Sequence, residues 1–304
     1  MMRVGGQAVM EGVLMRSPNF WSMAVRDPEG ELEVRAEPFN SITRRNPLFR
    51  LPVIRGFLSL AETLWLGMKA LTISTNIALG EEDELSRKEI AATLGFGLVL
   101  GLALFLAAPV LGTKGIDWLL GGVITNPLLF NIVEGIIRVL IFVAYLVGIS
   151  VLSRDIKRFF AYHGAEHKAI KVYERGEELV PENARRLDTT HVRCGTSFIL
   201  YVLVASIFIF SLLPITGWFW MVLSRILVIP LVAGLAFEFI MWSARNQSNP
   251  VVQVLVWPGL QMQKLTTREP SDEMVEVAMT ALRKVLAMER EARIAPDATG
   301  RLVI

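Results

Sequence analysis

The chain has 304 residues, of which 53% are apolar, and its mean hydropathy is +0.47. When Gly is counted and Tyr is left out, the apolar share becomes roughly 59%, against about 45 to 50% in soluble proteins. This argues against an ordinary cytosolic globule. The net charge of +2 gives no global reason to expect nucleic acid as a partner, and one cysteine cannot form a disulfide within the chain. An integral membrane protein with a substantial water-facing part remains.

Residues 1–52 predict a small cytoplasmic β element. Two segments of alternating polarity, residues 21–26 and 31–35, flank the turn-forming residues 27–30 and therefore indicate a β-hairpin. The start of the chain has no apolar core behind its first charge, so we expect no signal peptide.

Residues 53–80 are apolar but carry Arg55, Glu62 and Lys69. A spacing of seven keeps these charges on one helical face, within about 20° per step. We therefore predict an amphipathic helix that lies in the membrane interface or packs on the helical bundle, rather than a membrane span.

Four long stretches with few charges predict transmembrane helices, at residues 90–113, 132–153, 196–213 and 218–242. A charged side chain costs about 2.5 to 3.5 kcal/mol at the centre of an inserted helix, so such stretches are the best indication of spans. The second stretch contains Glu134 and Arg138, whose i, i+4 spacing allows them to pair.

The basic residues alternate along the chain. There are 11 before the first predicted span, 1 in the next loop, 9 in residues 154–193, none around Pro214 and 8 after Trp242. By the positive-inside rule, both termini and the loop of residues 154–195 are cytoplasmic. The C-terminal segment, residues 243–304, ends in an apolar repeat of helical spacing behind Ser271, which predicts an amphipathic helix. The sequence thus predicts a mainly α integral membrane protein with four transmembrane helices, a small cytoplasmic β element near the N-terminus and cytoplasmic helices.

All three histidines and the only cysteine lie within residues 163–194. His163, Glu166 and His167 share one face if their segment is helical, and two imidazoles at i, i+4 can bind one Zn²⁺. His191 and Cys194 follow at i, i+3 near the start of the third predicted span, where a helix N-terminus favours a thiolate. The clustering of every His and Cys in two motifs of ligand spacing favours a metal site.

Other interpretations of these residues remain open. The order His-x-x-Glu-His is also that of the inverzincin peptidases, in which the Glu is the general base. Cys194 with His191 as its base is a candidate nucleophile. Histidines at a membrane surface also bridge helices or headgroups, and a lone cysteine is often an inert buried residue.

Glu238 lies about 20 residues into the fourth predicted span, near its cytoplasmic end. An intramembrane carboxylate is a functional candidate, as a ligand, a proton carrier or a group that orients a ligating His. The alternative is that it reaches the interface and pairs with Arg245 or with the basic loop.

Four segments resemble the YqhQ family of bacterial membrane proteins: GGQAVMEGVLMRSP at 5–18, YHGAEHK at 162–168, HVRCGTSF at 191–198, and PGL at 258–260 with LTTREP at 265–270. The resemblance covers nearly the whole chain. It implies a multi-pass protein of the bacterial cytoplasmic membrane and a metal-dependent enzyme, whose site includes His163, Glu166, His167, His191 and Cys194. It implies no particular reaction.

Two hypotheses follow for the function. In the first, the protein is a metal-dependent hydrolase at the cytoplasmic membrane surface: His163, His167 and His191 or Cys194 hold Zn²⁺, while Glu166 and Glu238 are catalytic. Its substrates would be membrane-associated peptides or lipid-linked groups. In the second, His163, His167, His191 and Cys194 form a closed structural zinc site in a transporter, channel or assembly scaffold that acts as a homo-oligomer in the lipid bilayer.

Overall fold

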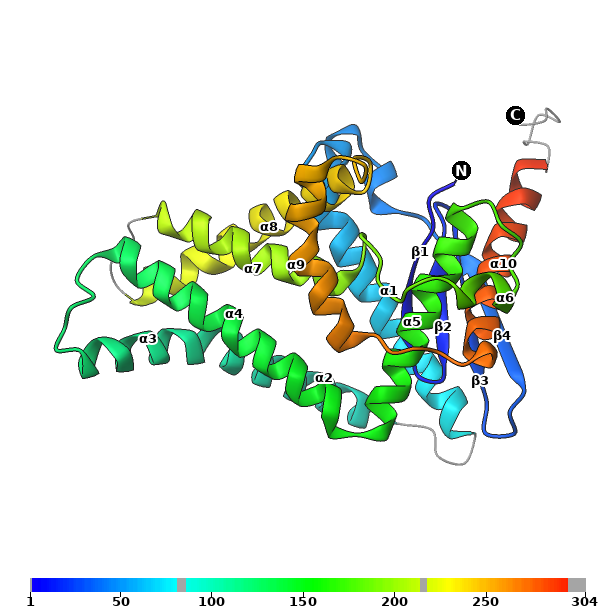
Figure 1. The fold of residues 1–304 in the computed structure, drawn as a ribbon, viewed down its shortest axis with the longest axis horizontal. Coiled ribbons are helices and arrows are strands. Elements are labelled where there is room, and N and C mark those ends of the chain that lie inside the picture. The colour runs from blue at the N-terminus through cyan, green and yellow to red at the C-terminus, as the bar shows by residue number, and fades with distance from the viewer. Residues whose placement is uncertain (1, 81–85, 214–217, 295–304) are drawn as a thin grey trace.

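The computed structural model describes residues 2–80, 86–213 and 218–294. It is mostly helical, with one four-stranded antiparallel sheet near the N-terminus. Figure 1 shows the sheet and the helices that cover it at one end of the molecule, and an arm of helices that extends from this end. We call α2, η4, α3, α4, α7 and α8 the helical arm.

The sheet consists of β1 (Gly5–Val9), β2 (Gly12–Arg16), β3 (Phe20–Arg26) and β4 (Leu32–Pro38), paired in this order. The predicted hairpin is the β3–β4 pair, in which the Gly30 N–H donates to the Asp27 carbonyl at 3.1 Å. The strands β1 and β2 were not predicted individually. Their signal is weak because β1 opens with two glycines and β2 is apolar on both faces.

Both faces of the sheet are covered by helices. On β2, Val13 and Met15 pack against α5 (Arg154–Glu174) and α10 (Asp272–Ile294), whereas Leu14 between them faces the opposite core, formed with α1 (Ile54–Leu79). The predicted C-terminal amphipathic helix is observed as α10. Most apolar residues on its inner face are buried, whereas Met274 and Leu286 are partly buried.

The three charged residues that were predicted to share one face of α1 contact other parts of the protein. Two short helices, η1 (Ile42–Arg44) and η2 (Pro47–Arg50), lead into α1. Each charge on its polar face forms an ion pair: Arg55 with Glu238 on α8, Glu62 with Arg16 on β2, and Lys69 with Glu37 on β4.

Two helices of the arm are long and apolar enough to cross a membrane. One is continuous over Ala91–Leu119 and the other covers Pro127–Val151. The first combines α2 (Arg87–Leu102), the π-helical turn η4 (Ala103–Ala107) and α3 (Ala108–Leu119), and the second lies in α4 (Pro127–Leu152). Both are longer than predicted, and within α4 Glu134 and Arg138 are buried and form the expected pair.

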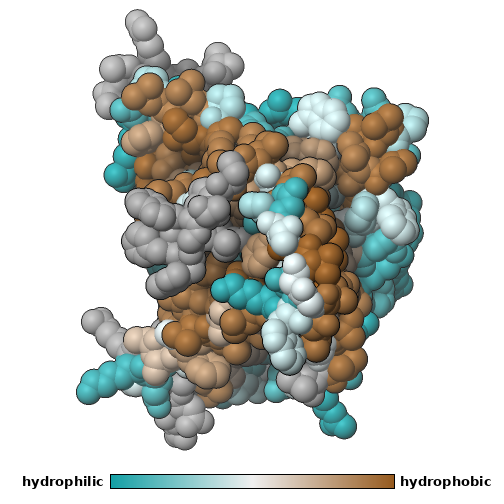
Figure 2. Space-filling view, turned by 90° about the vertical axis from the view of Figure 1, so that its left-hand side faces the viewer, coloured by the Kyte–Doolittle hydropathy of each residue, from teal (hydrophilic) through white to brown (hydrophobic). Residues whose placement is uncertain are grey.

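The remaining predicted spans correspond to α7 (Gly195–Ser211) and α8 (Trp218–Ser243). Among the described residues, α7 and the stretch Leu227–Ser243 of α8 are apolar but shorter than a span. Large apolar side chains are exposed along the arm, among them Phe96 at 70% and Trp118 at 78%. Figure 2, which faces the end of the arm, shows a surface that is mainly hydrophobic. Such a surface suits contact with lipid rather than with water.

Two further helices lie outside the arm. The short α6 (Pro181–Arg185), in the loop between α5 and α7, packs against α5 and α10, and α9 (Pro250–Thr266) precedes α10. Within the C-terminal segment, α9 was not predicted as a separate helix. Figure 1 shows that α9 runs across the base of the arm rather than along it.

Candidate metal centre

The helix α5 presents His163 and His167 on one face. It begins directly after α4, where the Ser153 hydroxyl accepts a hydrogen bond from the Ile156 N–H at 3.1 Å and so caps the first turn. The expected helical geometry over residues 163–167 is confirmed. It places the two imidazole rings 4.4 Å apart, centroid to centroid.

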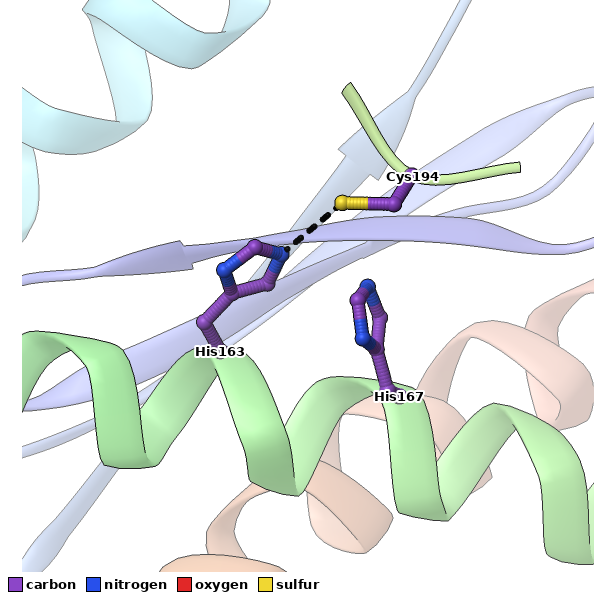
Figure 3. Close-up of side chains that lie close together, drawn as sticks. All are labelled: His163, His167 and Cys194. Atoms are coloured by element: carbon purple, nitrogen blue, oxygen red, sulfur yellow. Dashed lines mark hydrogen bonds between the residues drawn. The ribbon is translucent and has the colours of Figure 1, made fainter. Parts of the chain in front are cut away.

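Cys194 approaches these rings from the start of α7. It is the N-cap residue of that helix, and its Sγ accepts a hydrogen bond from the Thr196 N–H at 3.4 Å. Figure 3 shows the sulfur pointing towards His163, whose Nε2 lies 3.3 Å from Sγ.

The backbone orients both imidazoles for metal binding. His163 Nδ1 lies 2.8 Å from the Thr266 carbonyl oxygen, and His167 Nδ1 lies 2.6 Å from that of Thr189. Since a carbonyl only accepts, each Nδ1 must donate, which leaves Nε2 as the nitrogen that can bind a metal in the neutral ring. Ligating histidines in metal sites are held in this way.

The candidate ligand atoms of His163, His167 and Cys194 all lie within 4.8 Å of one another. His167 and Cys194 are buried, and His163 is half-buried. Two imidazole nitrogens and one sulfur are donors that suit Zn²⁺, and three protein ligands leave a coordination position for water or substrate. These residues therefore fit the metal that the family resemblance implies.

The structure places His191 beside this cluster but gives its ring other partners. Its Nε2 donates to the Glu174 carboxylate at 3.1 Å, and its Nδ1 accepts from the Arg193 N–H at 3.3 Å. The ring centroids of His191 and His167 are 5.7 Å apart. Burial lowers the pKa of His191, although the hydrogen bond to Glu174 opposes this effect. Of the four predicted ligands, three thus converge and His191 is their neighbour.

Glu166 is buried against the sheet, with 5% of its surface exposed. A Cβ at Gly6 on β1 would come within 2.8 Å of the Glu166 Cγ, so a glycine is needed for this close packing. Within the described part of the chain, the carboxylate forms no hydrogen bond or ion pair. Burial raises the pKa of Glu166 to about 7, despite the opposing effect of His163.

Two residues that support the site carried no signal in the sequence. The buried Gln263 on α9 accepts from the His191 N–H at 2.7 Å and donates to the His191 carbonyl at 2.9 Å. Thr189 supplies the carbonyl that holds His167. Gln263 contacts a residue 72 positions away in the sequence, so no local pattern reveals its role. Thr189 contributes a backbone oxygen, which every residue type has.

The segment of residues 265–270 crosses α5 next to the cluster. The Arg268 N–H donates to the Phe160 carbonyl at 2.9 Å, and a Cβ at Gly164 would lie 2.1 Å from the Arg268 oxygen. The buried Lys168 forms an ion pair with Glu269. Thr266, in the LTTREP segment, contacts His163 through its backbone carbonyl and not through its side-chain hydroxyl.

Glu238 lies on α8, and its carboxylate accepts from Arg55 Nε at 2.7 Å and from Arg55 Nη2 at 2.5 Å. It makes no hydrogen bond to the three clustered residues. The sequence suggested the basic loop or Arg245 as its alternative partner, whereas the structure provides an arginine on α1.

This fold and cluster define a mainly helical protein that has two helices able to cross a membrane and a His/Cys cluster beside a small sheet. The chain belongs to the family described as "Protein of unknown function (DUF1385)", which matches residues 51–288 and so includes the three clustered residues. It is 31% identical over 296 residues to the uncharacterized protein YqhQ of Bacillus subtilis (strain 168), across 94% of this chain and 92% of that protein. The family resemblance noted in the sequence is therefore confirmed. No solved structure matches the chain.

Proposed function

We propose that the protein is a metal-dependent membrane enzyme, a hydrolase that acts at the cytoplasmic surface of the bacterial inner membrane. His163, His167 and Cys194 would hold a divalent metal, with Zn²⁺ the best match to their donor atoms. The substrates would be membrane-associated peptides or lipid-linked groups, because the cluster lies at the base of an apolar helical arm.

One observation carries this proposal: three potential ligand atoms converge within 4.8 Å, and two of them are oriented by hydrogen bonds on the opposite side of their rings. In both His163 and His167 the backbone takes up Nδ1 and Nε2 faces the cluster, where that of His163 lies 3.3 Å from the Cys194 Sγ. The ring nitrogens of His191, by contrast, contact Glu174 and Arg193, outside the cluster.

A bound divalent ion would supply Lewis-acid chemistry, which polarises a carbonyl or phosphoryl oxygen and lowers the pKa of water. Glu166 is the candidate general base in this proposal, because its carboxylate is on the same helix and has no competing partner within the described residues. It would take the proton that the attacking water releases. Glu238 has a positioning role here, since its pair with Arg55 ties α8 to α1.

We also propose the four-span topology, with both termini and the metal cluster on the cytoplasmic side. Its support is the alternation of basic residues between loops, together with the apolar composition of α7 and α8. Such a topology places the cluster on the side of the membrane where cysteines stay reduced and available to metals.

Metal analysis of the purified protein tests the proposal. We expect about one Zn²⁺ per chain in the wild type and loss of the metal in a His163→Ala/His167→Ala variant. After substitution with Co²⁺, we expect a thiolate absorption band that disappears in Cys194→Ser. If the wild type and the double variant both purify without metal and neither takes up Zn²⁺ or Co²⁺, the proposal is wrong.

The second candidate function is non-enzymatic: a homo-oligomeric transporter, channel or assembly scaffold in which a closed zinc site is structural. The proximity of His191 to His167 favours keeping this alternative, because a ring rotation would bring a fourth ligand. A His191→Asn variant separates the two candidates. Retention of stoichiometric metal supports the three-ligand site of an enzyme, whereas loss of metal supports the closed site.

A further inference from the structure

A pocket of about 500 Å³ lies at the base of the helical arm, away from the residues of the metal cluster. Five arginines line it: Arg3, Arg44, Arg50, Arg55 and Arg245. They come from the start of the chain, from η1 and η2, from the first turn of α1 and from the residues after α8. Tertiary folding thus gathers guanidinium groups that lie up to 242 positions apart in the sequence.

Most of this positive charge is not neutralised by the protein. Arg55 is paired with Glu238, and Arg44 donates to the Asn19 side chain and to the Pro18 carbonyl at 2.7 Å. Within the described residues, Arg3 and Arg245 form no hydrogen bond or ion pair through their side chains. Partial burial and the nearby guanidinium groups, that of Arg245 first, lower the pKa of Arg3.

The pocket also has an apolar wall and an apolar border. Phe237 and Met241 line it from the end of α8. Next to the lining arginines on η2 and α1, the side chains of Leu48, Leu51 and Ile54 are exposed at 61%, 48% and 43%. Figure 1 shows the chain before α1, drawn in blue, beside the end of α8, drawn in yellow. Charged and apolar groups meet in this way where a protein contacts the headgroup region of a bilayer.

We propose that this pocket binds a phosphate group, and that an anionic lipid headgroup supplies it. Arginine suits this role because its planar group of donors binds phosphate oxygens in pairs. The exposed leucine and isoleucine side chains would contact the acyl chains next to the bound headgroup. This inference does not depend on the proposed metal chemistry, since the pocket shares no residue with the cluster.

Titration of the detergent-solubilised full chain with short-chain phosphatidylglycerol tests the proposal, with the rise in Tm as the readout. Phosphatidylcholine and inorganic phosphate are the comparison ligands. We expect phosphatidylglycerol to raise the Tm more than the neutral lipid does, by a shift that decreases with salt. An Arg3→Gln/Arg245→Gln variant should bind phosphatidylglycerol at least about tenfold more weakly than the wild type, because it loses charged hydrogen bonds to the phosphate.

The matched control is Arg175→Gln/Arg290→Gln, which removes two exposed arginines elsewhere and changes the net charge equally. It should bind phosphatidylglycerol as the wild type does. Since Arg3 makes no side-chain hydrogen bond within the described residues, the single variant Arg3→Gln provides a second test in a chain that retains the fold. Inorganic phosphate alone could raise the Tm of the wild type and not that of the pocket variants, while phosphatidylglycerol has no effect. This result supports a phosphate site but assigns it to a soluble phosphate. An equal effect of the two lipids without any effect of phosphate, or equal binding by the pocket and control variants, overturns the proposal.

Discussion

Single atoms determine how closely the sheet approaches α5. Gly5 and Gly6 are neighbours on β1, yet their surroundings differ. A Cβ at Gly6 would lie 2.8 Å from both the Glu166 Cγ and the Leu14 carbonyl oxygen, whereas a Cβ at Gly5 would meet nothing within 4 Å. The two glycines therefore differ in their surroundings, and only Gly6 is required for the packing of β1 beside the His/Cys cluster.

We expect Gly6→Ala to lower the free energy of unfolding by about 1 to 3 kcal/mol, as overpacking does in other cores. Gly5→Ala should be close to neutral, because its methyl group has room. Thermal or denaturant unfolding in detergent measures both variants. Equal stability of the two would show that β1 and α5 are not packed as described.

The tautomers of His163 and His167 are also decided by single atoms, the carbonyl oxygens of Thr266 and Thr189. Side-chain substitution at these threonines leaves the carbonyls in place. We therefore expect Thr266→Val and Thr189→Val to retain bound Zn²⁺, in contrast to the loss expected for His163→Ala/His167→Ala. Metal analysis of these three variants and the wild type makes this comparison. Loss of metal from both threonine variants would contradict a backbone role.

Among the elements, α1 shows how one helix joins two parts of the molecule. Its charges at spacing seven were predicted to form one polar face, in a helix that lies in the membrane interface or packs on the bundle. In the structure they bind β2, β4 and α8, so the helix connects the sheet to the helical arm. The three pairs differ in burial: the Glu62 side chain is 4% exposed, while that of Glu37 is 52% exposed.

This difference predicts unequal costs for removing the two carboxylates. Glu62 accepts from Arg16 at 2.7 Å, from the Ser41 hydroxyl and from the Ile42 N–H, so Glu62→Ala leaves several donors without an acceptor. We expect a loss of about 2 to 4 kcal/mol. Glu37→Ala removes only the exposed pair with Lys69 and should cost less than about 1 kcal/mol. A comparison of their unfolding curves tests this order, and a larger loss for Glu37→Ala would contradict it.

At the scale of the whole molecule, α7 and α8 decide how many spans the protein has. The first two arm helices satisfy the length and hydropathy of a span, whereas the apolar helices found elsewhere among the described residues, Gly195–Ser211 and Leu227–Ser243, are shorter. A cytoplasmic position of both termini requires an even number of spans, so two or four spans agree with the same placement of the His/Cys cluster.

Labelling of introduced cysteines distinguishes two spans from four. In a Cys194→Ser background, four spans predict that a membrane-impermeant thiol reagent labels Leu212→Cys in intact cells, since Leu212 is 80% exposed at the end of α7. Val123→Cys, between α3 and α4, should label under either topology, and Arg175→Cys should label only in permeabilised cells. Labelling of Val123→Cys but not of Leu212→Cys in intact cells would rule out four spans.

The sequence alone predicted the elements that have a strong period. The β3–β4 hairpin and α10 were both identified, because alternation and helical spacing are local properties of the chain. The strands β1 and β2 were missed, since burial on two faces removes the alternation from which a half-buried strand is recognised. The helix α9 was also not recognised as a separate element. Its apolar side chains lie on exposed as well as buried faces, so they do not form one apolar stripe of helical spacing.

By itself, the sequence determined that a chain of this family gathers its His and Cys residues in one short segment, and it predicted a membrane protein. Only the tertiary structure decided which of them converge. His163, His167 and Cys194 meet because α5 and the start of α7 pack together, while Glu174 holds His191 and Arg55 holds Glu238. The arginine pocket likewise has no sequence motif. Ligand geometry and pairs of charges depend on contacts between distant segments, and local periodicity carries no information about them.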